Sequence, residues 1–278
     1  MKNELKKIGI GIIGCGSIGG DIAQVINAGD ISNAELIALF DQDGTRGRSL
    51  ESRLHKDVRY FCDIDHFLAT NKLDLIIECA SPIAVRDFGE KILSSKMHLM
   101  IMSAGALLDE GFLQILIHTA DIYGKELLIP SGAIGGLDAI RSVAHQLEEV
   151  TLTTTKPPSG LSGSPGFKEW ENMQVNSKVV IYQGSAMEAV KLFPANVNVA
   201  ASLSLAGLGA VETKVKVVVD PRASSNTHEI VAKGQFGTFR LTFENQPHPK
   251  NPRTSYLSIL SAIELLNSFC GTAPKIGS

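Results

Sequence analysis

The sequence is poor in the features that mark several specialised classes of protein. It has 4 cysteines in 278 residues and no Cys-x-x-Cys pair, so neither a disulfide framework nor a zinc site of the usual spacing is expected. No combination of His, Cys, Asp and Glu has metal-ligand spacing, and we predict no metal. No uninterrupted apolar run approaches the ~18 residues of a membrane span, and the first residues lack the apolar core of a signal peptide. These absences favour a cytoplasmic protein without a membrane partner.

Charge of either sign is not in marked excess. The 26 Lys and Arg residues nearly balance the 29 Asp and Glu residues, for a formal net charge of −3. This balance gives no electrostatic reason to expect a nucleic acid or an anionic membrane surface as partner. The hydrophobic content of 44% is that of an ordinary globular protein, and 278 residues are enough for two domains.

A glycine-rich turn follows the first apolar run of the chain. Residues 8–13 are apolar, residues 14–19 read Gly-Cys-Gly-Ser-Ile-Gly, and apolar residues then recur with helical spacing. A strand, a tight turn and a helix in this order form the phosphate-binding unit of dinucleotide folds, in which the helix N-terminus faces the pyrophosphate. The motif alone is weak evidence, because glycines also mark ordinary turns. The residues predicted to contact a dinucleotide here are Gly14, Gly16, Ser17, Ile18 and Gly19.

An acidic residue ends the second predicted strand. Residues 34–40 read as a strand, and Asp41 follows at a spacing somewhat longer than the usual ~20 residues. A carboxylate there can accept the ribose hydroxyls of NAD and repels the 2′-phosphate of NADP, although a turn or helix-capping Asp is the alternative. Arg46 and Arg48 lie just downstream and could reach a 2′-phosphate. The pattern therefore favours NAD and leaves NADP possible.

Strands and helices alternate through the first half of the chain. Further strands are predicted at residues 59–61, 73–80, 98–102 and 126–130, with helices between them, which indicates a doubly wound parallel sheet of the Rossmann type. Ligands bind at the carboxyl ends of such strands, so Cys79, Ala80 and Ser81 are expected to border the cofactor. A plain strand-to-helix turn explains Cys79 equally well. A second glycine-rich loop, residues 131–138, is expected at the same edge.

The second half of the chain has a different pattern. Residues 150–156, 179–182, 213–219, 228–232 and 238–244 read as strands, with helices at 186–192 and from 196 to 208, which predicts an α+β sheet domain. Asn251-Pro252 reads as the N-cap and first turn of a C-terminal helix. We expect a dinucleotide-binding domain over residues 1–131 and a substrate and oligomerisation domain over 132–250. The final segment, 251–278, is expected to dock back on the first domain, and an exposed sheet in the second favours a homodimer.

Seven motifs in order give the chain a resemblance to a known family. From about residue 8 to residue 267 it resembles the L-aspartate dehydrogenase family, and the later motifs are the distinctive ones. They are the turn at 14–19, Pro-Ser-Gly-Ala-Ile-Gly-Gly-Leu-Asp at 130–138, Lys-Pro-Pro at 156–158, Phe-Pro-Ala-Asn-Val-Asn-Val-Ala-Ala at 193–201, Asp-Pro at 220–221, Asn-Thr-His-Glu-Ile at 226–230 and Asn-Pro-Arg-Thr-Ser at 251–255.

The resemblance implies NAD(P)-dependent oxidation of L-aspartate to iminoaspartate, then oxaloacetate and ammonia, or the reverse amination; in some members iminoaspartate feeds NAD biosynthesis. It also implies a catalytic histidine at His228 and cofactor contacts at Ala133 and Asn198. A dicarboxylate substrate needs cationic or N–H-rich partners, for which Lys156 and the segment around Asn196 are candidates. Asn198 is also explained as a helix N-cap.

Position alone leaves the role of His228 open, because most histidines at the start of a strand are structural or exposed. The other six histidines read as solvated, structural or loop residues. Two alternatives to an aspartate dehydrogenase also remain: another two-domain NAD(P) oxidoreductase, of the homoserine dehydrogenase or dihydrodipicolinate reductase kind, and an NAD-binding sensor without chemistry.

Overall fold

A computed structural model of the chain describes residues 7–271, apart from 172, 174, 195–197 and 250, and leaves the side chains of 252 and 253 undescribed. The described residues form two compact units. One contains the residues up to Pro130 together with those from Ala262 onward, and the other spans Ser131–Ser261. None of the helices in this part of the chain combines the length and the apolar character that crossing a bilayer requires.

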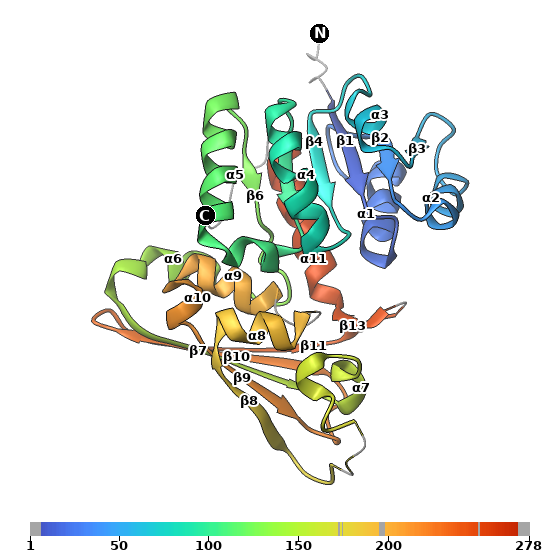
Figure 1. Cartoon of the computed structure of the whole chain (residues 1–278). Helices are drawn as coiled ribbons and strands as arrows, with labels where there is room; N and C mark the ends of the chain where they lie inside the picture. The colour runs from blue at the N-terminus through green and yellow to red at the C-terminus, as the bar shows by residue number, and fades with distance from the viewer. Residues whose placement is uncertain (1–6, 172, 174, 195–197, 250, 272–278) are drawn as a thin grey trace. The chain divides into compact units, whose positions relative to one another are not determined.

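The first unit is built on a six-stranded sheet in the order β3-β2-β1-β4-β5-β6 (Figure 1). All its strand pairs are parallel. This order changes direction between β1 and β4, so it confirms the predicted doubly wound α/β sheet. The central strands are buried because their sequences are almost continuously apolar. The strands are β1 (Ile8–Ile13), β2 (Ala34–Phe40), β3 (Arg59–Phe61), β4 (Leu75–Glu78), β5 (His98–Ile101) and β6 (Leu127–Leu128).

The helices of this unit begin where short polar side chains can cap them. Asp43, Asp63, Ser81 and Asp109 each accept a hydrogen bond from a backbone N–H of the helix that follows. The first helix differs, because its N-cap is Gly16, which has no side chain. Its first-turn N–H groups therefore lie at the end of β1 without a local side-chain acceptor. The helices are α1 (Ser17–Ala28), α2 (Gly44–Glu51), α3 (Ile64–Leu68), α4 (Pro82–Ser94) and α5 (Glu110–Tyr123).

The second unit contains a mixed five-stranded sheet in the order β11-β10-β7-β9-β8. β7 runs parallel to β9, and the other pairs are antiparallel. Alternate residues of its strands contribute apolar side chains to one buried core, which fits the predicted α+β sheet domain. The strands are β7 (Leu147–Lys156), β8 (Val179–Ser185), β9 (Lys214–Val219), β10 (Asn226–Gly234) and β11 (Gly237–Asn245).

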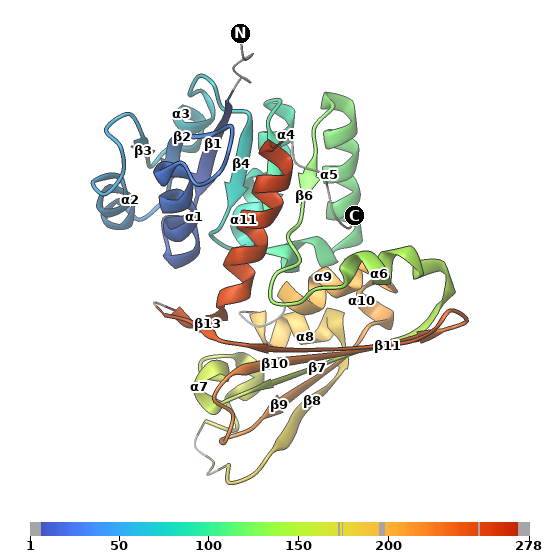
Figure 2. The ribbon, with the colours of Figure 1, turned by 180° about the vertical axis from the view of Figure 1, so that it is seen from behind.

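Helices cover one face of this second sheet, as Figures 1 and 2 show for α6, α8, α9 and α10. Side chains such as Ile140, Ala189 and Leu203 pack from these helices onto the apolar face of the sheet. This core fixes the central strands β7 and β10, whose ends carry the polar residues considered below. The helices are α6 (Leu137–Ser142), α7 (Pro158–Leu161), α8 (Ala186–Leu192), α9 (Asn198–Ala206) and α10 (Gly209–Glu212).

The C-terminal helix begins later than its sequence indicated. The prediction that Asn251-Pro252 starts it is wrong, because Asn251–Ser255 forms strand β13, which pairs with β12 (Pro247–His248). The helix α11 (Tyr256–Cys270) follows directly. In its last turn the Cys270 carbonyl accepts a hydrogen bond from Asn33 Nδ2 at 3.3 Å, and the Phe269 ring lies edge-on to His98. Pairing of the cap-like dipeptide with β12 has overridden its local preference for a helix start.

Candidate active site

The glycine turn after β1 has the geometry that a pyrophosphate site requires. Gly14 has φ of +97°, and a Cβ there would lie 2.8 Å from the backbone of Cys79. A Cβ at Gly19 would lie 1.9 Å from the Gly14 carbonyl oxygen, so only glycine lets α1 approach the strand this closely. A Cβ at Gly16 would meet no described atom within 4 Å. The space over Gly16, beside the N-terminus of α1, therefore fits the phosphates of a dinucleotide.

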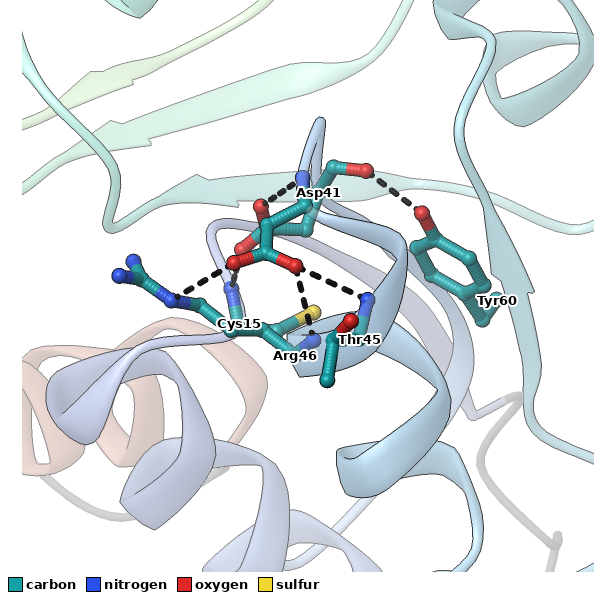
Figure 3. Close-up of polar contacts among 6 residues, drawn as sticks. Cys15, Asp41, Thr45, Arg46 and Tyr60 are labelled. Atoms are coloured by element: carbon teal, nitrogen blue, oxygen red, sulfur yellow. Dashed lines mark hydrogen bonds and ion pairs between the residues drawn. The ribbon is translucent and has the colours of Figure 1, made fainter.

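Asp41 directs its carboxylate at this turn (Figure 3). Its Oδ2 accepts the Cys15 backbone N–H at 2.7 Å, and its Oδ1 accepts the Asp43 N–H at 2.8 Å. Tyr60 Oη donates to the Asp41 carbonyl at 2.8 Å, which fixes the backbone from the other side. The carboxylate thus stands at the end of β2 next to the glycine turn, where the ribose of an adenosine would be recognised.

Arg46 is held by a neighbour of Asp41. Its Nε lies 3.2 Å from Asp43 Oδ2 in an exposed ion pair, and Asp43 Oδ1 also accepts the Thr45 and Arg46 N–H groups at the start of α2. Figure 3 shows these contacts of Arg46 and Thr45. This ion pair places a negative charge beside the Arg46 guanidinium, which reduces its attraction for a 2′-phosphate.

Cys15, inside the turn, is a packed residue. Burial, and secondarily the Asp41 carboxylate, raise the pKa of the Cys15 thiol to about 12, so it stays protonated at neutral pH. Its Sγ lies 3.9 Å from the Phe40 carbonyl oxygen. All four cysteines of the chain are free thiols.

The residues after β4 are held by an acidic side chain that the sequence analysis did not single out. Cys79 and Ser81 are half-buried and Ala80 is exposed. Glu78, the last residue of β4, is only 1% exposed, and its Oε1 accepts the backbone N–H groups of Ala80 and Ser81, each at 2.8 Å. An acid at the end of an otherwise apolar buried strand was the available signal.

The second unit brings two predicted site residues together. Lys156 ends β7 and is 3% exposed, while His228 lies near the start of β10 and is 2% exposed. In the register of β7 and β10, His228 is paired with Thr154, two residues before Lys156 on the same face of the strand. Thr154 Oγ1 and His228 Nδ1 are hydrogen bonded at 3.1 Å. Sequence reasoning missed Thr154 because one strand's pattern does not reveal its partner's register.

Burial governs the protonation of this pair. It lowers the pKa of His228 to about 3, with a further contribution from the charge of Lys156, so the imidazole is neutral at neutral pH. It also lowers the pKa of Lys156 to about 8, which leaves the ammonium mainly charged at pH 7. The cluster therefore offers a neutral acid–base group beside a cation, which suits proton transfer on an anionic substrate.

Polar residues surround the same end of the sheet. Asn226 is opposite Asn245 in the β10–β11 register, and both are buried. Asn226 Nδ2 donates to Ser255 Oγ at 3.4 Å, and Asn245 Nδ2 donates to the Ala133 carbonyl at 2.8 Å. Ala133, a predicted cofactor contact, is thereby fixed within the second glycine-rich loop and is 3% exposed.

The remaining predicted site residues are placed differently. Asn198 is exposed at the first position of α9, and Asn196 lies outside the described residues. The predicted roles of both stay predictions.

The six histidines other than His228 lie outside this group of residues. Four of them are exposed, His98 accepts the Glu126 N–H at 3.0 Å, and His248 is 2% exposed. Within the described residues, no group of three or more His, Cys, Asp and Glu side chains could hold a metal ion.

Comparisons with known proteins divide the chain in a similar way. Residues 138–269 match the family model "Aspartate dehydrogenase, C-terminal", and residues 14–130 match "Homoserine dehydrogenase, NAD binding domain". The chain is 43% identical over 271 residues to an L-aspartate dehydrogenase of Nitrosopumilus maritimus (97% of this chain, 99% of the relative) and 38% identical over 270 residues to one of Methanocaldococcus jannaschii, with the same coverage.

Two solved structures share the fold. The crystal structure of aspartate dehydrogenase from Thermotoga maritima covers 97% of this chain with a TM-score of 0.77 and 27% identity, and 99% of that chain is covered. The structure of GenD2 from gentamicin A biosynthesis, in complex with NAD, has a TM-score of 0.59 over 96% of this chain and 86% of its own, at 13% identity. The second likeness concerns the fold alone.

Proposed function

Because the chain belongs to the L-aspartate dehydrogenase family, we propose that it oxidises L-aspartate to iminoaspartate with NAD(P), and that water then releases oxaloacetate and ammonia. The observation that supports this most is the buried pair of His228 and Lys156 in the part of the chain that matches the aspartate dehydrogenase model. When bound, the nicotinamide coenzyme supplies the acceptor for the hydride that leaves Cα of the substrate.

His228 is the group that we assign to proton transfer. If its Nδ1–H donates to Thr154 Oγ1, its Nε2 lone pair is free to take a proton from the water that attacks the imine carbon. Burial and the charge of Lys156 lower the pKa of His228, so the imidazole is neutral at neutral pH, which is the form that can accept this proton. The negative charge of a bound dicarboxylate would raise this pKa toward the range of an effective base. In that tautomer the hydrogen bond with Thr154 also orients the imidazole ring.

Lys156 is the cation that we assign to a substrate carboxylate. A buried ammonium is stabilised by an anionic partner in the same water-poor environment, and L-aspartate carries two carboxylates. A substrate that lacks the second carboxylate would form a weaker electrostatic interaction with Lys156. Asn196 is proposed as a further partner of the substrate, and Ala133 and Asn198 as contacts of the coenzyme.

For the coenzyme we propose a preference for NAD. Asp41 offers the ribose hydroxyls two carboxylate oxygens beside the glycine turn. The other proposed contacts of the coenzyme in this unit are the segment 79–81 and the turn residues Gly14, Gly16, Ser17, Ile18 and Gly19. The Asp43 ion pair engages Arg46, which reduces the attraction for a 2′-phosphate. Use of NADP with lower efficiency is compatible with this arrangement.

A substrate panel tests the assignment. Purified protein and NAD are expected to form NADH with L-aspartate and much more slowly with L-homoserine, L-glutamate or L-alanine, measured at 340 nm. Faster turnover of L-homoserine would support the alternative suggested by the homoserine dehydrogenase model over residues 14–130. No aspartate-dependent reaction in either direction would reject the proposal. A homodimer, a cytoplasmic location and a link to NAD biosynthesis stay predictions.

A further inference from the structure

Glu78 is a buried carboxylate that the reaction proposed above does not use. It ends β4 and is 1% exposed. Its Oε1 accepts three hydrogen bonds, from the N–H groups of Ala80 and Ser81 at 2.8 Å and from Ser103 Oγ at 2.9 Å. Its Oε2 accepts the Ser103 N–H at 3.0 Å. We refer to these four hydrogen bonds as the Glu78 cluster.

The Glu78 cluster joins two segments that leave the sheet side by side. Glu78 is paired with Ile101 in the β4–β5 register, and the Met102 N–H donates to the Glu78 carbonyl at 3.0 Å. The segment 79–81 then leads into α4, and Ser103 leads into the short 3-10 helix Ala104–Leu108. Both segments thus begin at the carboxyl edge of the sheet, where doubly wound folds bind their ligands.

Packing alone does not explain a carboxylate at this position. Burial raises the pKa of Glu78, whereas hydrogen bonds from Ser103, Ala80 and Ser81 lower it. The preceding residues Leu75, Ile76 and Ile77 fill the buried strand with apolar side chains, which need no such compensation. What the carboxylate adds is a set of acceptors that fixes the backbone of both segments at once.

The position of the cluster indicates which half of the coenzyme it serves. The sheet changes direction between β1 and β4, and Asp41 stands on the β2 side of that point. The β4 and β5 side belongs to the second mononucleotide-binding half of the fold, opposite the adenosine. The Cys79 N–H donates to the Ile13 carbonyl at 2.7 Å, so the segment 79–81 borders the glycine turn directly.

We propose that Glu78 is a positioning residue, which holds segment 79–81 and Ser103 in the arrangement that receives the nicotinamide half of the coenzyme. This inference rests on the proposed function and adds to it a residue acting through other groups. It predicts that disturbing the cluster weakens binding of the whole coenzyme and leaves binding of its adenosine half unchanged.

The test compares NADH with ADP-ribose, which carries the adenosine and pyrophosphate but lacks nicotinamide. Glu78→Gln preserves an oxygen acceptor but places an NH₂ group where Oε2 accepts the Ser103 N–H. We expect the Kd for NADH to rise about tenfold and the Kd for ADP-ribose to change less than about twofold, both measured by isothermal titration calorimetry. Glu90→Gln, an exposed substitution on α4, is the matched control and should change neither Kd.

Equal weakening of both ligands would overturn the proposal, since it would mean that Glu78 supports the fold of the unit as a whole. Unchanged binding of NADH would overturn it too. If Glu78→Gln does not fold, Ser103→Ala is the second test. It removes the Ser103 Oγ donor, and we expect the Kd for NADH to rise about threefold while the Kd for ADP-ribose stays unchanged. Wild-type protein that binds NADH but leaves L-aspartate unoxidised would refute the proposed function and leave the test of Glu78 intact.

Discussion

Replacement of Asp41 by alanine should shift the choice of coenzyme from NAD toward NADP. In the structure the Asp41 carboxylate accepts the N–H groups of Cys15 and Asp43 and stands beside the glycine turn, half-buried. With NAD it would accept the ribose hydroxyls. With NADP it would face a 2′-phosphate that carries about −1.5 to −2 charges.

The expected magnitude follows from these charges. At about 5 Å in a water-like dielectric, one carboxylate and a doubly charged phosphate repel each other by about 1.7 kcal/mol, and burial strengthens the repulsion. Loss of charged hydrogen bonds to the ribose weakens NAD binding by a further 1.5–3 kcal/mol, roughly. The two effects sum to about 3.2–4.7 kcal/mol, so we expect the ratio of kcat/KM for NAD to that for NADP to fall by roughly 200- to 3,000-fold.

A ratio is the appropriate readout because Asp41 also supports the turn. Loss of its bond from Cys15 should weaken both coenzymes alike, and that effect cancels in the ratio. Asp41→Asn retains an acceptor without the charge and should give an intermediate ratio. Asp63→Ala removes another aspartate that accepts a backbone N–H, at the start of α3, and should leave the ratio unchanged. An unchanged ratio in Asp41→Ala would refute the role of Asp41 in recognising the ribose.

Three further predictions concern packing, orientation and protonation. Gly19→Ala places a Cβ 1.9 Å from a backbone oxygen and should abolish NADH binding and lower Tm, whereas at Gly20 the nearest atom is 3.8 Å away and Gly20→Ala should be tolerated, as calorimetry would reveal. Thr154→Val should lower kcat about 5- to 30-fold with little change in the KM for NAD, whereas Thr153→Val, on the other face of β7, should not; equal kcat values would contradict the orienting role. Folding lowers the pKa of His228 from 6.5 to about 3, so the unfolded state binds more protons than the folded state between these values. The contribution of His228 to the free energy of unfolding is therefore most favourable above pH ~6.5, and the free energy of unfolding falls by up to about 1.4 kcal/mol per pH unit as the pH falls toward 3. Urea titrations at pH 7 and 5 should show this fall in wild type and not in His228→Asn.

The first unit was largely predictable because its information is local. Glycine spacing, apolar runs and the acid at Asp41 each act within a few residues, and they placed β1, α1 and β2 close to their observed bounds. The start of α11 was wrong for a non-local reason: Asn251-Pro252 satisfies the rules for a helix start, but the pairing of β12 with β13 decides its conformation.

The group of Thr154, Lys156 and His228 was predictable only in part. A single sequence, with its resemblance to a family, singled out Lys156 and His228. It could not reveal that β7 lies beside β10, so Thr154 was missed. Glu78 was missed for a related reason, because its carboxylate accepts hydrogen bonds from Ser103, which follows the neighbouring strand β5.

The most direct test of the account is the rate of aspartate oxidation by His228→Ala, measured together with its affinity for NADH. We predict an NADH Kd close to that of wild type and a kcat with L-aspartate lower by roughly 10²- to 10⁴-fold, the usual contribution of a positioned acid–base group. Near wild-type turnover of L-aspartate by a folded His228→Ala variant would contradict the role assigned to His228.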